Sequence, residues 1–341
     1  MISHNVSYEN LNSFGQVSPI ECYKLNVLSF VCFIIFIFSL FFNTILLWVF
    51  FTNKELRSPL NIIIIALTFL NLFGTLTELP VVIITNYSCR WVFNKLICTI
   101  VAFIMYFIGC SSIYLLTVIS FERWYAIVNP FEQRYLTYKY TCLIIMLCLL
   151  FSLIWCVAPL FGWSYYSLEI SLTTCSVEWN DHSLNVISYN MTIFGFVYLI
   201  PLVVLIYTNI KLIFMIRGLS GFLKTSKQTY ITKRRLIKER KLTISILLII
   251  FCFMISWTPY AIVSLISSFF YNYIKISPIG SLIPSVFAKT SLLWPSVLYI
   301  FSNNQIKTFL SNKLNFRKKS LHTETSYSLH SRKSKRIGQY V

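Results

Sequence analysis

The chain has 341 residues, of which 57% are hydrophobic and only 12% are charged, and its formal net charge is +18. A soluble domain carries about 25% charged residues, so this composition excludes a large soluble protein and indicates an integral membrane protein. No nucleic-acid partner is expected, because the basic residues follow the pattern of membrane topology described below.

Seven mostly apolar runs follow one another along the chain, each bounded by charged or polar residues. About 20 apolar residues cross the ~30 Å hydrocarbon layer as a helix, and none of the runs alternates as a barrel strand would. The predicted spans are 25–51, 59–86, 97–120, 141–163, 186–216, 242–270 and 279–302. The expected fold is therefore an all-α membrane protein, a seven-transmembrane helix bundle over residues 25–302.

The basic residues predict the orientation of this bundle. They gather in the links after the first, third and fifth spans, most densely in 217–241, and in the C-terminal tail. The positive-inside rule therefore places the N-terminus outside and the C-terminus in the cytoplasm. Residues 1–24 become an extracellular tail, in which the sequon "NVS" makes Asn5 a glycosylation site. We expect 303–316 to form an amphipathic helix on the membrane surface and 317–341 to be a disordered, basic cytoplasmic tail.

Four of the ten cysteines fall on the extracellular side, where disulfides persist: Cys22, Cys89, Cys98 and Cys175. A bridge from Cys98 to Cys175 would hold the long loop 164–185 across the bundle. Cys22 and Cys89 could pair instead, and the spacing alone does not choose. The sequence has no CxxC pair or His–Cys cluster, so no metal is predicted.

One lysine lies well inside the seventh span, in "SVFAKTSLLWPSVLYIF" (285–301). A lysine at the membrane centre costs roughly 2.5–3.5 kcal/mol on insertion scales, so Lys289 marks a functional site by default. If desolvation removes its proton, the amine can attack an aldehyde and form a Schiff base. If it stays charged it needs a carboxylate, and Glu78 in the second span could be a purely structural partner.

Five segments, in the order of the family, resemble motifs of animal opsins among the rhodopsin-like G-protein-coupled receptors. The segment "LRSPLNIIIIALTFLNLF" (56–73) resembles the entry to the second span, and "FERWYAIVNP" (121–130) resembles the Glu-Arg-aromatic motif. The segment "APLFGWSYYSLE" (158–169) resembles the start of the second extracellular loop. The segment "SWTPY" (256–260) resembles the sixth-span aromatic segment, and "SVFAKTS" (285–291) resembles the retinal-attachment segment. The resemblance covers about 25–310. The segment "SNNQIK" (302–307) resembles the ciliary or encephalopsin-like branch.

The resemblance implies a chromophore site. Lys289 would hold retinal, 11-cis or all-trans, through a Schiff base, and Trp257 and Tyr260 would line the retinal pocket. It also implies a disulfide between Cys98 and Cys175, which the spacing left open.

The position of the carboxylate that serves as the counterion of the Schiff base differs between members of this family. Vertebrate visual pigments carry it three residues after the third-span cysteine, where this chain has the uncharged Val101. Glu169 matches the extracellular-loop glutamate of many other opsins and is the favoured candidate, with Glu78 second.

Further matches imply signalling. Glu122, Arg123, Glu239 and Tyr299 match groups that switch the cytoplasmic ends of the helices. The resemblance therefore implies a light-activated receptor in the plasma membrane rather than an enzyme. Its expected partner is a heterotrimeric G protein of the Gi, Go or transducin type, with arrestin and a receptor kinase at the tail.

The sequence also departs from the family in the seventh span, and two other functions stay open. The usual Asn-Pro reads Pro295–Ser296 here, which bears on how a signal leaves the bundle. A retinal photoisomerase would use the same fold and the same lysine. A receptor for a diffusible ligand would use Lys289 only as a structural residue.

Overall fold

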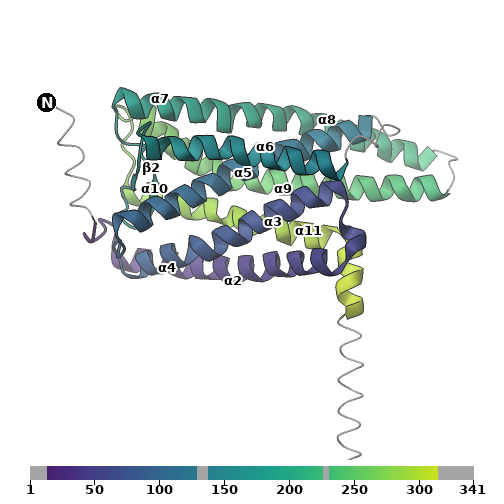
Figure 1. Ribbon diagram of the computed structural model, residues 1–341, viewed down its shortest axis with the longest axis horizontal. Coiled ribbons are helices and arrows are strands. Elements are labelled where there is room, and N and C mark those ends of the chain that lie inside the picture. The colour runs from purple at the N-terminus through teal and green to yellow at the C-terminus, as the bar shows by residue number, and fades with distance from the viewer. Residues whose placement is uncertain (1–13, 129–136, 226–229, 314–341) are drawn as a thin grey trace, which may run out of the picture.

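The computed structural model describes residues 14–128, 137–225 and 230–313, which form a bundle of long helices lying side by side (Figure 1). The crossing helices are α2 (Cys22–Thr52), α3 (Pro59–Thr77) with α4 (Leu79–Tyr87), α5 (Lys95–Val128), α6 (Tyr138–Val157), α7 (Leu184–Ile193) with α8 (Ile200–Thr225), α9 (Tyr230–Phe269), and α10 (Pro278–Ala288) with α11 (Trp294–Ser302). Each predicted span corresponds to one helix or to one interrupted helix. The prediction of a seven-helix bundle is confirmed.

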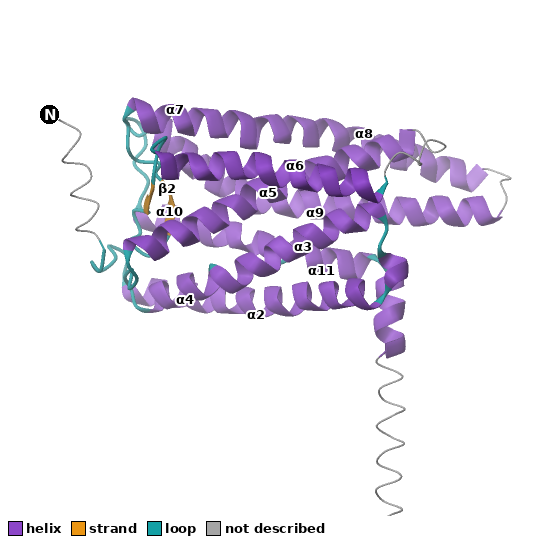
Figure 2. Ribbon diagram, viewed as in Figure 1, coloured by secondary structure: helices purple, strands orange, loops and turns teal. Residues whose placement is uncertain are grey.

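Short elements interrupt or join the long helices. They are the 3₁₀ segments η1 (Lys54–Leu56), η2 (Ala158–Phe161) and η4 (Lys289–Leu292), the π-helical segment η3 (Phe194–Leu199), and the strands β1 (Tyr166–Leu168) and β2 (Cys175–Val177). The two strands form an antiparallel hairpin at one end of the bundle (Figure 2). A further helix over 304–313 lies at the opposite end (Figure 1).

The interrupted helices reflect local sequence. Proline has no N–H to donate within a helix. Pro80 lies in the first turn of α4, and Pro295 in the first turn of α11. Within the described residues, six helices are long and apolar enough to span a membrane. The seventh span falls outside that set because η4 divides it into two shorter helices.

Helix starts also follow local sequence. A Ser or Thr side chain at the N-cap accepts a hydrogen bond from an otherwise unpaired backbone N–H of the first turn. Four helices begin in this way, at Ser58, Thr137, Ser183 and Ser277.

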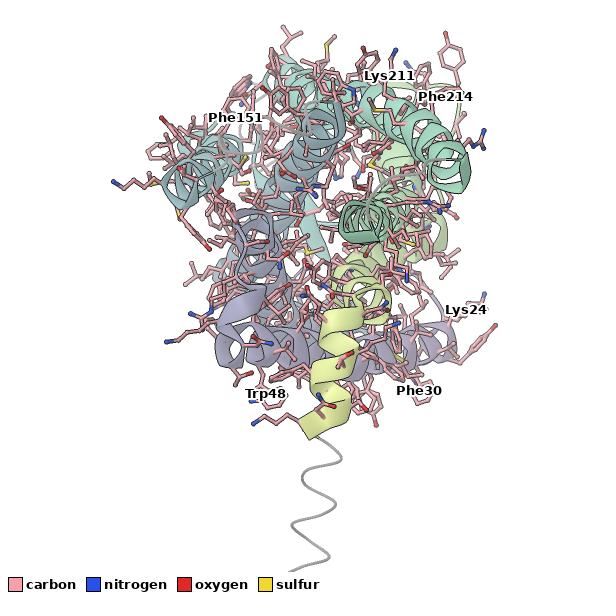
Figure 3. All side chains as sticks on the ribbon, turned by 90° about the vertical axis from the view of Figure 1, so that its right-hand side faces the viewer. Lys24, Phe30, Trp48, Phe151, Lys211 and Phe214 are labelled. Atoms are coloured by element: carbon pink, nitrogen blue, oxygen red, sulfur yellow. A yellow bond between two sulfur atoms is a disulfide. The ribbon has the colours of Figure 1, made fainter. Side chains whose placement is uncertain are left out.

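The side chains are sorted as in a membrane protein. Large apolar groups such as Phe30 and Phe214 lie on the outside of the bundle (Figure 3), and each is more than 60% exposed. The interior contains buried leucines and isoleucines together with Ser, Thr and Asn side chains, several of which hydrogen-bond between helices. An apolar exterior around a partly polar interior is what lipid requires, because lipid tails cannot satisfy polar groups.

Two disulfides tie the hairpin end of the bundle together. Cys98, near the start of α5, pairs with Cys175 of β2, as the resemblance implied. Cys22, at the start of α2, pairs with Cys89 after α4. The two pairs therefore coexist and are not alternatives.

Helix 304–313 covers most of the predicted membrane-surface helix. Its Ile306 is fully buried, and the ring of Phe309 lies 5.9 Å from that of Trp48 on α2. Contact with the bundle therefore holds this helix, whereas its placement on a membrane surface stays a prediction. The predicted disordered tail, 317–341, and Asn5 lie outside the described residues.

Candidate functional site

Lys289 is the first residue of η4, at the point where the seventh span is interrupted. Its side chain is 6% exposed, and its Nζ lies 2.9 Å from Oε1 of Glu78, whose side chain is 5% exposed. Nζ also donates to the backbone and side-chain oxygens of Ser285, each at 3.4 Å. A buried ammonium is therefore paired with a buried carboxylate, which is the arrangement that makes such a charge tolerable.

Glu78 owes its position to the break in the second span. It lies between α3 and α4 and caps both helices, two residues before Pro80. One oxygen of Glu78 contacts Lys289, while the other, Oε2, is buried without a hydrogen-bond partner. The carboxylate therefore has unused acceptor capacity next to the lysine.

A cavity of about 430 Å³ surrounds this ion pair, and Glu169, Tyr106 and Trp257 are among its other lining residues. A second cavity of about 580 Å³ extends between α5, the α7–η3 region and α9. The two share Tyr106, Trp179, Trp257 and Tyr260, so they adjoin. Small-molecule sites are mostly apolar, with a few placed polar groups.

The second cavity supplies the apolar part of this site. Its lining includes Ile113, Ile193, Phe194, Val197 and Phe253. A long apolar molecule with one aldehyde end would place that end at Lys289 and its hydrocarbon part among these side chains. The donor set therefore fits retinal.

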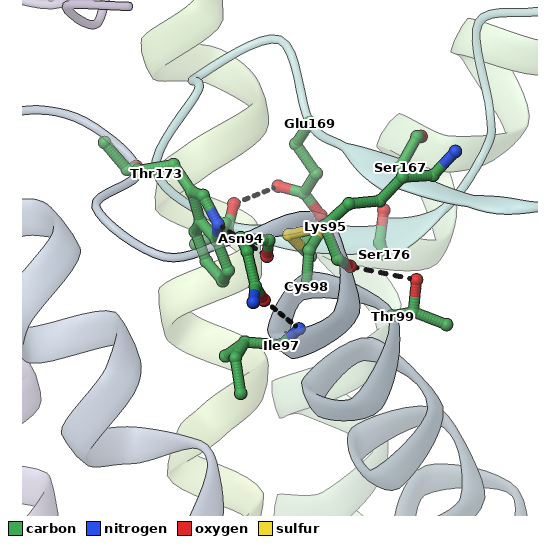
Figure 4. Close-up of a disulfide and its surroundings, with 12 residues drawn as sticks. Asn94, Lys95, Ile97, Cys98, Thr99, Ser167, Glu169, Thr173 and Ser176 are labelled. Carbon is green, nitrogen blue, oxygen red and sulfur yellow. Dashed lines mark hydrogen bonds between the residues drawn. A yellow bond between two sulfur atoms is a disulfide. The ribbon is translucent and has the colours of Figure 1, made fainter. Parts of the chain in front are cut away.

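Glu169 lines the cavity but is held by other partners. Its Oε1 accepts a hydrogen bond from the Tyr260 hydroxyl at 3.1 Å, and its Oε2 accepts one from Thr174 Oγ1 at 2.7 Å. Figure 4 shows Glu169 beside the disulfide of Cys98. Among the described residues, the carboxylate within ion-pair distance of Lys289 is that of Glu78. In the structure Glu78, rather than the favoured Glu169, contacts Lys289, and the choice of counterion stays a prediction.

The two predicted aromatic residues both line the joined cavities. The Trp257 indole N–H donates to Ser291 Oγ at 3.0 Å, and its ring stands edge-on to that of Tyr260. A Cβ added to Gly109 on α5 would approach the Trp257 ring to 2.8 Å. Gly109 therefore makes room for the indole.

Sequence reasoning missed several residues of this site. Ser285 precedes Lys289 by four positions, so helical spacing alone could have identified it as a neighbour. Gly109 and Ser291 contact Trp257 from other helices, and no local signal in the sequence indicates those contacts.

At the opposite end of the bundle, Arg123 forms an ion pair with its neighbour Glu122, and Arg123 is buried. The hydroxyl of Tyr299 donates to Asn61 Oδ1 at 2.6 Å. Glu239 is on α9, but its side chain lies outside the described part of the chain. Its predicted part in switching the cytoplasmic ends of the helices therefore stays a prediction.

The unusual Pro295–Ser296 pair has its own hydrogen bonds. Ser296 Oγ donates to Asn43 Oδ1 at 2.6 Å, and Asn43 Nδ2 donates to the carbonyl of Leu292 at 3.0 Å. Ser39 Oγ donates to the same carbonyl at 3.2 Å. Polar side chains of α2 thus satisfy a backbone carbonyl at the end of η4, three residues after Lys289.

Three comparisons with known proteins all match this chain to rhodopsin-type receptors. The model of the seven-transmembrane receptors of the rhodopsin family matches residues 42–300. Opsin-VA of Rutilus rutilus is 28% identical over 306 residues, which are 89% of this chain and 78% of that protein. Melanopsin of Felis catus is 29% identical over 80% of this chain and 57% of its own length. The crystal structure of squid rhodopsin has a TM-score of 0.77 at 22% identity, covering 90% of this chain and 89% of that one.

The chain therefore belongs to the rhodopsin family of seven-transmembrane receptors and is a multi-pass membrane protein. Its similarity to opsins confirms the resemblance to animal opsins drawn from the motifs. These relatives are receptors of the light-sensing kind.

Proposed function

We propose that this chain is a light-activated receptor that holds retinal covalently on Lys289 and activates a heterotrimeric G protein. The observation that carries the proposal is the amine of Lys289, buried beside a carboxylate at the head of an apolar cavity. When bound, retinal supplies the absorption of light and the change of shape that follows.

The residues around Lys289 have distinct roles in this proposal. Ser285 orients the Nζ atom, because two of its oxygens lie 3.4 Å away. Glu78 is the primary counterion, because it contacts the nitrogen that would carry the positive charge. Glu169 lies farther out and acts on the same nitrogen through the field of its charge.

In this proposal, a change in the shape of retinal is transmitted toward the cytoplasmic end of the bundle, starting at Trp257. The indole borders the cavity and donates to Ser291 of η4, so a change in ligand shape acts on both α9 and the interrupted seventh span. The resting state is held by the pairs Arg123–Glu122 and Tyr299–Asn61. Light would shift the population away from this arrangement.

Location and partners follow from the same proposal. The N-terminus faces outward and the C-terminus faces the cytoplasm at the plasma membrane. The G protein is of the Gi, Go or transducin type, and arrestin and a receptor kinase act at the tail beyond residue 313.

Light-dependent nucleotide exchange tests the proposal. The purified receptor is loaded with 11-cis-retinal, and exchange on Gi, Go and transducin is measured in darkness and after illumination. We expect exchange to rise on illumination, and the Lys289→Ala variant to show no rise. A receptor that isomerises and releases retinal without any exchange would be a photoisomerase. A receptor that forms no light-sensitive band would favour a diffusible ligand, with Lys289–Glu78 as a structural pair.

A further inference from the structure

The chain from residue 14 to residue 21 lies at the hairpin end of the bundle, before α2 begins, and we call it the N-terminal strap (Figure 2). The backbone N–H of Ser18 donates to the carbonyl of Cys89 at 2.9 Å, and its hydroxyl donates to the carbonyl of Ser171 at 2.6 Å. The strap therefore contacts both the end of the second span and the turn between β1 and β2. The proposed light response gives it no role.

The strap places one large apolar side chain inside the bundle. Ile20 is 7% exposed and belongs to a small cluster of buried side chains that is separate from the main core, whereas Val17 on the same strap is 70% exposed. The other members of this apolar cluster come from α2, from α4 and the residues after it, and from α10. They are Leu25, Cys32, Val82, Cys89, Leu282 and Val286.

The apolar cluster lies between the strap and the ion pair of the candidate site. The backbone N–H of Val82 donates to the carbonyl of Glu78, so Val82 lies one helical turn nearer the hairpin end. The backbone N–H of Lys289 donates to the carbonyl of Val286, which precedes it on α10. Cys32 of α2 is fully buried and lies close enough to the pair that the charges of Glu78 and Lys289 both act on its thiol. Ile20 therefore closes the outer end of an apolar path that leads to Lys289.

The hairpin closes the other side of the site with stronger connections. Glu169 is held by hydrogen bonds from Tyr260 and Thr174. The disulfide between Cys98 and Cys175 holds β2 against α5. Water can pass on this side only if buried hydrogen bonds break.

The strap is held more weakly than the hairpin. Within residues 14–21 the buried side chains are those of Ser18 and Ile20, and a segment with few buried contacts opens at a low cost in free energy. The disulfide between Cys22 and Cys89 follows the strap directly and limits how far it can move. The strap is therefore the part of this closure that opens most readily, and the disulfide keeps it in place.

We propose that the N-terminal strap is a seal that controls the entry of water to the bond between Lys289 and retinal, along the apolar path between α2, α4 and α10. This inference rests on the proposed function. Hydrolysis of that bond consumes one water molecule. Its oxygen goes to the retinal carbon as the aldehyde, both of its hydrogens go to the nitrogen, and Lys289 is left as a free amine. A closed strap therefore prolongs the time for which retinal stays bound.

Labelling of Cys32 tests the seal without retinal. A charged, membrane-impermeant methanethiosulfonate is added to the full-length receptor in lipid nanodiscs, and mass spectrometry follows each cysteine. The Cys22→Ser/Cys89→Ser variant opens the disulfide and leaves no new thiol, so labelling of Cys32 should be at least about tenfold faster than in the wild type. Cys156, which is buried in the main core, should stay unlabelled in both, because it reacts only if the bundle itself unfolds.

Ile20→Ala opens the seal while it keeps the disulfide. The smaller side chain leaves the outer end of the apolar cluster uncovered, so labelling of Cys32 should again be faster. Val17→Ala shortens an exposed side chain of the same strap and is the matched control, which should label as the wild type does. If the double serine variant does not fold, the comparison of Ile20→Ala with Val17→Ala decides the test.

Loss of retinal in darkness connects the seal to the bond. The retinal-loaded receptor is kept in darkness with hydroxylamine, a small polar nucleophile, and the decay of its absorption band is followed. Variants that label faster at Cys32 should lose the band faster, and Val17→Ala should not. The proposal is overturned if Cys32 is labelled equally in all variants, or if faster labelling is not accompanied by faster loss of retinal. A wild type that binds no retinal would instead contradict the proposed function, and the labelling of Cys32 would still show whether the strap seals this path.

Discussion

Replacing Glu78 by Gln removes the negative charge next to Lys289 while keeping the size of the side chain. In the structure the two groups are 2.9 Å apart, and their side chains are 5–6% exposed. Breaking such a buried pair costs about 3–5 kcal/mol, because the remaining charge is left uncompensated. At 1.36 kcal/mol for each power of ten, the protonated form of the retinal-bound nitrogen should lose about two to four powers of ten in stability.

Absorption spectroscopy of the retinal-loaded receptor measures this loss. A protonated Schiff base absorbs in the visible range and a neutral one in the near ultraviolet. We expect the wild type to keep a visible band at neutral pH, and Glu78→Gln to show an ultraviolet band that acid converts to the visible form. Glu169→Gln is the comparison and should keep its visible band, because Tyr260 and Thr174 hold that carboxylate away from Lys289. A visible band kept by Glu78→Gln and lost by Glu169→Gln would refute the assignment of Glu78.

Three further predictions follow from other contacts. Cys175→Ser should destabilise the receptor by about 2–4 kcal/mol, measured by thermal melting, because it opens a loop closed over 77 residues. Gly109→Ala should lower the melting temperature and slow retinal uptake, with a cost of about 1–3 kcal/mol, because its Cβ would lie 2.8 Å from the Trp257 ring. Tyr299→Phe should raise nucleotide exchange in darkness, because it removes the hydrogen bond to Asn61 that we propose holds the resting state.

Each of these predictions has a result that would contradict it. A Cys175→Ser receptor that melts with the wild type would show that the bridge does not constrain the unfolded chain. Unchanged retinal uptake by Gly109→Ala would show that the indole can move at little cost. If nucleotide exchange in darkness is unchanged both in Tyr299→Phe and in Asn61→Ala, the hydrogen bond between these two residues does not stabilise the resting state.

The sequence predicted the seven spans because a helix that crosses lipid must be apolar over a fixed length. It also pointed to Lys289, because a lone amine in such a span is costly. It could not predict where the seventh span breaks. The carbonyl of Leu292 is satisfied by Asn43 and Ser39, which are about 250 positions away in the chain.

The counterion shows the same limit. Glu169 was favoured because it matches the extracellular-loop glutamate of other opsins. The distance to Lys289 favours Glu78, because the break before Pro80 brings the Glu78 carboxylate to the lysine. The cysteines show it too. Four cysteines on one side allow several pairings, and only the positions of α2, α4, α5 and β2 in space select the two that form.

The most direct test of the central claim is to locate the bound retinal. The receptor is incubated with 11-cis-retinal in darkness, reduced with borohydride, digested and mapped by mass spectrometry, and a parallel sample is illuminated before reduction to follow its absorption. We predict one retinyl adduct, on Lys289, and an absorption band that light shifts. An adduct on other lysines only, or none, together with a spectrum unchanged by light, would contradict the claim that this chain is a retinal-based light receptor.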